Sequence, residues 1–108
     1  MMSRLRTLVL FALLGLTGAA QAAGYTGPFV ITSLWISGAE NQHVRVSGFP
    51  AMTGACPRGS TWLYINQSAS GSKEYMAALM LAYGTGKPVN IYWQEDGNGY
   101  CQIIEMGV

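Results

Sequence analysis

The order of hydrophobic and polar positions predicts a chain built mainly of strands. Alternating or continuous runs of β-branched and aromatic residues, bounded by glycine, proline or serine, are typical of strands. Such runs occupy residues 29–36, 43–48, 61–66, 88–94 and 100–106. In the second run, alternation places Val44 and Val46 on one face and the polar residues on the other.

The period changes in residues 68–84, where the pattern predicts one helix. Four large apolar residues recur there at spacings of three and four: Met76, Leu79, Met80 and Tyr83. Serines precede the run, and Gly84 follows it where a helix would end. The expected order is therefore β-β-β-α-β-β.

This order is expected of an OB-fold, a small and partly open five-stranded barrel. Other small α+β sheets have the same order and remain alternatives. We expect residues 24–108 to form a single domain, because no repeat, low-complexity tract or charge run marks a linker. Residues 49–60, rich in proline and glycine, are expected to form a loop that is held by Cys56.

Residues 1–23 have the composition of a secretory signal peptide. A short basic segment precedes an apolar stretch that ends in small residues, so we expect cleavage after Ala22 or Ala23. The alternative, a membrane anchor, needs about 20 apolar residues, and the run here is shorter. We therefore expect a secreted or periplasmic protein whose mature chain does not span a membrane.

Export changes the interpretation of the two cysteines, Cys56 and Cys101. In an oxidising compartment we expect them to form a disulfide bond. Closing a loop of about 46 residues contributes about 4 kcal/mol in the chain-entropy estimate. A reactive thiol or a metal ligand is the alternative.

Charge argues against a nucleic-acid partner. Without the first 23 residues, four basic residues remain against five acidic residues, a formal net charge of −1. Proteins that hold nucleic acid through its phosphates usually carry a clustered basic surface. We therefore expect no nucleic-acid binding.

The segment 82–93 contains Gly86 and Lys87, two residues of a phosphate-binding loop. That motif continues with serine or threonine and leads from a strand into a helix. Here Pro88 follows the lysine, and the predicted direction is from helix to strand. We predict a corner that ends the helix.

Catalytic and metal-binding residues are sparse. His43 is the single histidine, and the acidic residues fall in separate predicted elements apart from the neighbours Glu95 and Asp96. A glycosidase needs two carboxyl groups held across a cleft, and a zinc site needs several histidine or cysteine ligands. We expect no enzyme, no metal and no cofactor.

Aromatic and amide side chains are abundant in the predicted strands and turns. Flat rings beside neutral hydrogen-bonding groups suit a sugar, which has an apolar side and a rim of hydroxyls. Packing within a sheet is the alternative explanation for each ring.

Three landmarks resemble a known family: Val30-Ile31-Thr32, the helix end at residues 83–89, and Ile91-Tyr92-Trp93. They resemble the B subunits of the subtilase cytotoxin and typhoid toxin group, relatives of pertussis-like toxin B subunits, over most of the chain up to residue 94. The resemblance implies a secreted OB-fold subunit that forms a homo-pentamer and binds sialylated glycans.

For a glycan-binding function we expect Thr26, Tyr92 and Trp93 to be the ligand contacts. Thr26 would be a shifted substitute for a serine of the family, and Trp93 falls where the family has a pocket tyrosine. The family's cysteines lie elsewhere, and its segment after the fourth strand is longer.

Two classes of function follow. The first is a glycan-binding domain, alone or in a ring. The second is a periplasmic accessory or structural domain that binds a protein partner and has no sugar site. An exposed ring and at least two polar side chains that converge in one concavity would favour the first.

Overall fold

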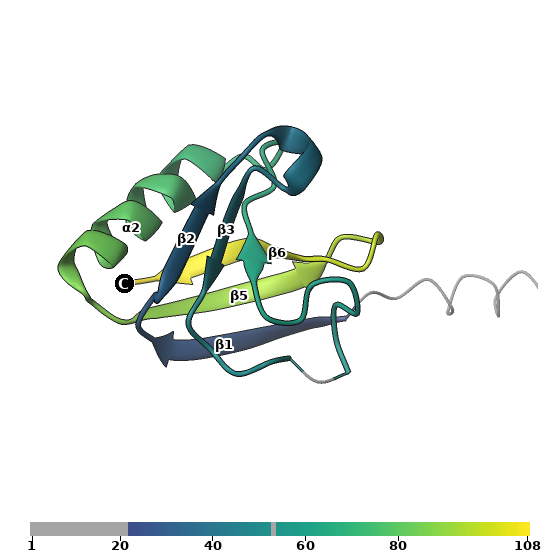
Figure 1. Ribbon diagram of the computed structural model, residues 1–108, viewed down its shortest axis with the longest axis horizontal. Coiled ribbons are helices and arrows are strands. Elements are labelled where there is room, and N and C mark those ends of the chain that lie inside the picture. Colours follow the sequence, from purple (N-terminus) through teal and green to yellow (C-terminus); the bar gives the residue numbers. More distant parts are fainter. Residues whose placement is uncertain (1–21, 53) are drawn as a thin grey trace, which may run out of the picture.

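The computed structural model describes residues 22–52 and 54–108, which form a six-stranded sheet and one α-helix (Figure 1). The strands are β1 (Ala23–Phe29), β2 (Ser33–Ile36), β3 (Val44–Ser47), β4 (Leu63–Tyr64), β5 (Val89–Glu95) and β6 (Cys101–Gly107), with a short 3₁₀ helix η1 (Ala39–Asn41) and the α-helix α2 (Ser72–Thr85). The prediction of a mainly β chain with one helix between the third and fourth predicted strands is confirmed. The predicted signal peptide, residues 1–23, lies outside the described residues apart from Ala22 and Ala23.

The sheet is mixed and open, with the strand order β1-β5-β6-β4-β3-β2. β4 and β6 are parallel, and the other neighbouring strands are antiparallel. The two edge strands, β1 and β2, follow each other directly in the chain, yet no ladder joins them in the described part of the protein. Residues 22–52 and 54–108 therefore do not form the predicted five-stranded barrel, and they contain six strands.

The prediction of one strand over residues 29–36 is wrong. Phe29 ends β1, residues 30–32 form a link, and β2 begins at Ser33. The break arises because β1 pairs with β5 and β2 pairs with β3, so this segment passes from one edge of the sheet to the other. Within the link, the N–H group of Thr32 donates a hydrogen bond of 2.9 Å to the carbonyl oxygen of Ser47.

The core lies between the sheet and α2. Val44 and Val46 are buried as their alternation predicts, and so are Val89, Ile91 and Trp93 of β5. From α2 the fully buried residues are Leu79 and Ala82, whereas Met80 and Tyr83 are exposed. The apolar spacing therefore predicted the helix correctly, and of the four residues that define it Leu79 is fully buried.

The corner after α2 is confirmed. Gly86 has φ 68°, in the left-handed region, and the N–H group of Lys87 donates to the carbonyl oxygen of Ala82 at 3.2 Å. Gly84 remains inside the helix. Pro88 then separates this cap from β5.

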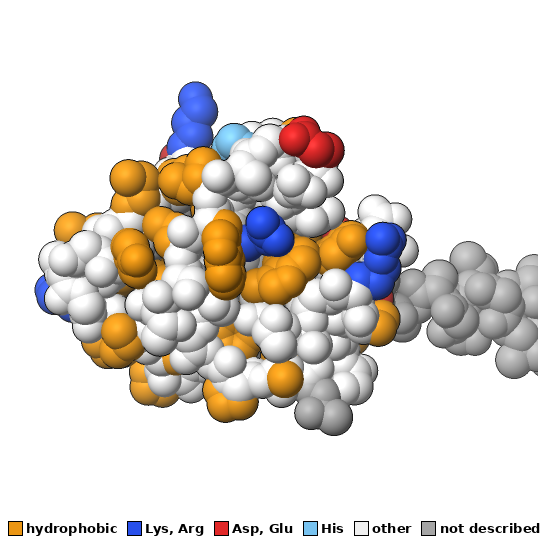
Figure 2. Space-filling model, viewed as in Figure 1, with side chains coloured by type: hydrophobic (Ala, Val, Ile, Leu, Met, Phe, Trp, Pro, Cys, Tyr) orange, Lys and Arg blue, Asp and Glu red, His pale blue; other side chains and the backbone are white. Residues whose placement is uncertain are grey.

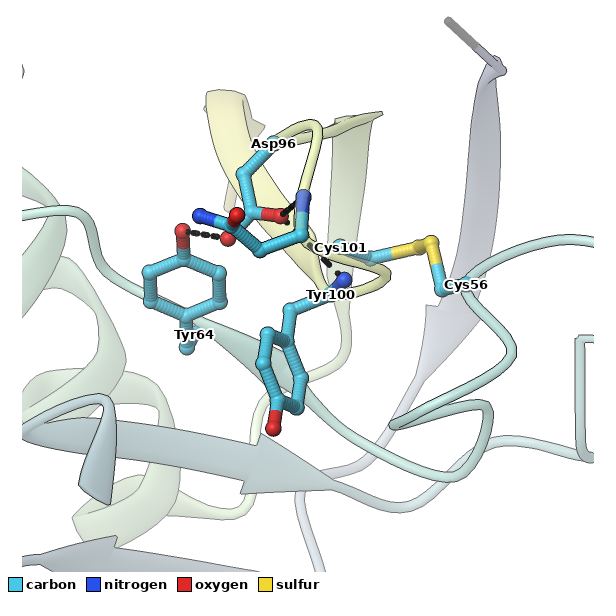
Figure 3. The surroundings of a disulfide bond; sticks show 6 residues. Cys56, Tyr64, Asp96, Tyr100 and Cys101 are labelled. Carbon is cyan, nitrogen blue, oxygen red and sulfur yellow. Dashed lines mark hydrogen bonds between the residues drawn. A yellow bond between two sulfur atoms is a disulfide. The ribbon is translucent and has the colours of Figure 1, made fainter. Parts of the chain in front are cut away.

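The predicted disulfide bond between Cys56 and Cys101 is also confirmed, with both residues buried (Figure 3). It joins the long segment between β3 and β4 to the first residue of β6. Within the residues that the structure describes, no helix is both long and apolar enough to cross a membrane.

Candidate functional site

A row of side chains crosses three neighbouring strands on the outer face of the sheet. Tyr25 of β1 lies opposite Tyr92 of β5, and Tyr92 lies opposite Glu105 of β6. Residues directly opposite each other in antiparallel strands share a face and lie within contact distance. The two tyrosine residues are 48% and 46% exposed, and their ring centroids lie 4.9 Å apart with planes inclined by 46°.

Asn90 completes a concavity beside this row. It lies two residues before Tyr92 on the same face, and its Oδ1 accepts a 2.6 Å hydrogen bond from the Tyr25 hydroxyl. The concavity has a volume of about 320 Å³. We call it the tyrosine site; its lining residues are Tyr25, Asn90, Tyr92, Glu105, Met106 and Gly107.

Two glycines shape the surroundings of Asn90. Gly107 lies opposite Asn90 and contributes no side chain, which leaves the space above the amide open. On the other side, Gly27 has φ 132°, and a Cβ atom there would lie only 2.7 Å from the carbonyl oxygen of Val89. Only glycine accepts this combination of dihedral angle and close backbone approach.

The tyrosine site offers groups that can bind a polar ring. Its two half-exposed tyrosines provide apolar ring surface, and Asn90 and Glu105 provide hydrogen-bonding groups at the border. Because the amide oxygen of Asn90 already accepts from Tyr25, its NH₂ group is the part that can donate to a ligand. The arrangement can hold a ligand.

The structure separates the three residues that the sequence singled out as ligand contacts. Tyr92 lines the tyrosine site, whereas Thr26 lies opposite the buried Ile91 and Trp93 lies opposite Gly24. Thr26 and Trp93 thus share the inner face of the sheet, away from Tyr92. Trp93 is only 7% exposed, and a Cβ atom at Gly24 would lie 2.6 Å from its Cζ2. Its ring packs in the core, so it does not present a stacking face.

A second feature is a stack of arginine and aromatic side chains, which we call the arginine ladder. Its members, in spatial order, are Trp35, Arg45, Trp62, Tyr100 and Arg58. The Arg45 Cζ lies 5.7 Å from the Trp35 ring centroid and 5.4 Å from that of Trp62. Trp62 and Tyr100 stack with centroids 5.3 Å apart, and the Arg58 Cζ lies 4.9 Å from the Tyr100 centroid. Hydrophobic and basic side chains accordingly lie next to one another on this face (Figure 2).

Glycines also make the arginine ladder possible. A Cβ atom at Gly59 would lie 2.6 Å from Cζ2 of Trp62, and one at Gly99 would lie 2.8 Å from Cγ of Arg58. The stack therefore fits closely against the segments that carry it. The two inner rings, Trp62 and Tyr100, each pack against two other members of the stack. They therefore offer ring edges rather than open faces to a ligand. We regard the ladder as a cover for the sheet where β4 has only two residues.

The third feature is a hollow of about 480 Å³ between loops at one end of the sheet. We call it the loop-end hollow; it is lined by η1 and its flanking residues, the end of β4 and the β5–β6 loop. His43, Arg58, Glu40 and Asp96 all border it, so its charge is mixed.

Asp96, which lines the loop-end hollow, accepts three hydrogen bonds. The Tyr64 hydroxyl donates to Oδ2 of Asp96 at 2.5 Å, while Oδ1 of Asp96 accepts from the N–H groups of Asn98 and Tyr100 (Figure 3). Burial, and then the hydrogen bond to Asp96 and its negative charge, raise the pKa of Tyr64 far above its ordinary value. Tyr64 is therefore a neutral donor that ties the β5–β6 loop to β4.

Comparison of the chain with known protein families, with characterised proteins and with solved structures finds no match. Across residues 22–52 and 54–108, no three histidine, cysteine or acidic side chains are grouped so that they could hold a metal ion.

Proposed function

We propose that the chain is a small exported binding domain without enzymatic activity, and that it binds a glycan at the tyrosine site. The observation that carries the proposal is the convergence of two half-exposed rings, an amide and a carboxylate in one concavity. Sugar-binding sites combine ring surface with a few polar groups that fix orientation.

We also propose that the sheet is a variant of the OB-fold. If β1 and β2 are the two halves of one interrupted first strand, the chain has five strands with a helix between the third and fourth. The placement of those halves at opposite edges of the sheet supports this interpretation. An OB-fold is often used to bind oligosaccharides or oligonucleotides.

The proposed location is secreted or periplasmic. The disulfide bond between Cys56 and Cys101 supports it, because disulfides persist in oxidising compartments. The composition of residues 1–23 supports the same location.

A glycan array with residues 24–108, followed by titration of any hit, tests the proposed activity. We expect Tyr92→Ala to weaken binding by about tenfold, which is the scale of one lost stacking contact. Tyr83→Ala is the matched control, because Tyr83 is 47% exposed but lies on α2, outside the tyrosine site. The proposal fails if no glycan binds, or if both variants weaken binding equally.

A second candidate is a domain that binds a protein partner, which includes other copies of this chain in a ring of five. The observation that favours it is a group of exposed apolar residues on α2: Met80, Leu81 and Tyr83. Exposed apolar surface of this kind often marks an interface. Light scattering tests the ring directly, since a monomer at high concentration would exclude it.

A further inference from the structure

The charge of the tyrosine site is set by one residue. Among the described residues that line it, Glu105 is acidic and none is basic. Glu105 belongs to the row that also contains Tyr25 and Tyr92, so its carboxylate stands beside the exposed rings. A ligand in the site therefore meets a negative charge without a compensating positive charge from the lining.

The tyrosine rings, like Glu105, favour a positively charged ligand. The face of an aromatic ring carries partial negative charge and attracts a cation. Both rings are about half exposed, and their planes are inclined to each other by 46°, so they do not cover one another completely. This differs from the inner rings of the arginine ladder, whose faces are occupied.

Neighbouring groups provide the remaining contacts that a sugar requires. The Asn90 NH₂ group can donate to a hydroxyl group of the sugar. Because Gly107 has no side chain, a sugar ring can approach this amide. A protonated amine on the sugar would then lie between the carboxylate and the ring faces. Acidic sugars would bring a second negative charge next to Glu105, which disfavours them.

We propose that the tyrosine site selects a positively charged amino sugar, a glucosamine-type unit with a free amine, over neutral and acidic sugars. This inference rests on the proposed glycan-binding function and specifies its ligand class. It differs from the sialylated ligand that the family resemblance implies.

Calorimetric titration with three probes tests the inference: β-1,4-linked glucosamine oligomers, the corresponding N-acetylglucosamine oligomers and a sialylated trisaccharide. The solution should be mildly acidic, so that the amines are protonated, and low in salt, so that screening is weak. We expect glucosamine oligomers to bind about tenfold more tightly than the acetylated oligomers. The sialylated probe should bind more weakly than either.

The decisive variant is Glu105→Gln, which keeps the shape of the side chain and removes its charge. It should reduce the glucosamine preference to about twofold while leaving the affinity for N-acetylglucosamine oligomers nearly unchanged. Glu74→Gln is the matched control, because Glu74 is an exposed acid in the first turn of α2, outside the site.

The possible outcomes separate this inference from the proposed function. Equal binding of acetylated and free-amine oligomers, or tighter binding of the sialylated probe, overturns the inference and leaves glycan binding intact. An equal effect of Glu74→Gln and Glu105→Gln would show that the amine is attracted by overall charge, which also overturns it. Failure of the wild-type protein to bind any saccharide overturns both.

Discussion

At the scale of single residues, Tyr64 has a well-defined structural role. Its side chain is nearly buried, and its hydroxyl donates to a carboxylate that also accepts two backbone N–H groups of the β5–β6 loop. A hydrogen bond to a charged acceptor contributes more to stability than one between neutral groups. The conformation of the β5–β6 loop should therefore depend on the Tyr64 hydroxyl.

Replacing Tyr64 with phenylalanine should lower the free energy of unfolding by about 2 kcal/mol, because Asp96 loses a donor in a partly buried setting. Urea denaturation measures this effect. Tyr75→Phe is the matched control, since the Tyr75 hydroxyl donates to a neutral acceptor, the carbonyl oxygen of Ile104, at 2.7 Å. That variant should lose about 1 kcal/mol or less; an equal loss in both variants would contradict the special role of Tyr64.

The raised pKa of Tyr64 predicts that the stability of the protein depends on pH in the alkaline range. Burial and Asp96 raise the pKa of Tyr64 in the folded state, whereas in the unfolded chain a tyrosine ionises near its ordinary pKa of about 10. Above that pH the folded state keeps a proton that the unfolded state releases, so stability falls as pH rises. Urea midpoints measured at about pH 9 and about pH 11 should therefore separate more for the wild type than for Tyr64→Phe. Equal separations would show that Tyr64 ionises normally.

At the scale of elements, two glycines at the end of α2 have opposite roles. Gly84 lies within the helix, and a Cβ atom there would meet no atom within 4 Å. Gly86 is equally uncrowded, but its φ of 68° is unfavourable for any residue with a Cβ atom.

Gly84→Ala should raise the free energy of unfolding by about 0.5–1 kcal/mol, because alanine is the better helix former. Gly86→Ala should lower it by about 1 kcal/mol, because alanine pays a steric penalty in the left-handed region. Thermal or urea denaturation distinguishes the two signs. A shift of both variants in the same direction would contradict the assigned helix end.

Elements with a clear period could be predicted from the sequence, and β1 could not. The alternation of Val44 and Val46 correctly identified the buried face of β3, and the helical spacing located α2. β1 instead contains Gly24, Gly27 and Pro28, a composition typical of loops. It forms a strand because it pairs with β5, and as an edge strand it tolerates proline.

The candidate site was predictable only in part for the same reason. The alternation along β5 already placed Trp93 with Val89 and Ile91, on the face that the structure buries. The family resemblance nevertheless directed attention to Trp93. Tyr25 and Glu105 join Tyr92 only through strand register, and register between distant segments is not visible in local sequence.

At the scale of the whole molecule, the disulfide bond joins parts that share little regular structure. Cys56 lies in the long segment before β4, and β4 has only two residues. The bond fixes this segment to the start of β6, near the arginine ladder and the loop-end hollow.

Replacing both cysteines with alanine should lower the free energy of unfolding by about 4 kcal/mol, because the unfolded chain regains the freedom of a loop of about 46 residues. Urea denaturation of the double variant and of the wild type under reducing conditions should agree. A loss below about 1 kcal/mol would show that the segment is held by its side-chain packing instead.

β1 and its partner strand β5 lie far apart in the sequence, and this distance limits when the tyrosine site can form. During synthesis Tyr25 is made long before Tyr92 and Glu105. β1 therefore cannot pair until β5 has been synthesised. A chain that is interrupted before residue 89 could already stack Trp35, Arg45 and Trp62, but it would have neither β5 nor β6. Recognition at these tyrosines would thus require that the chain has been made at least through β6, and fragments that end before β5 should not bind the ligand.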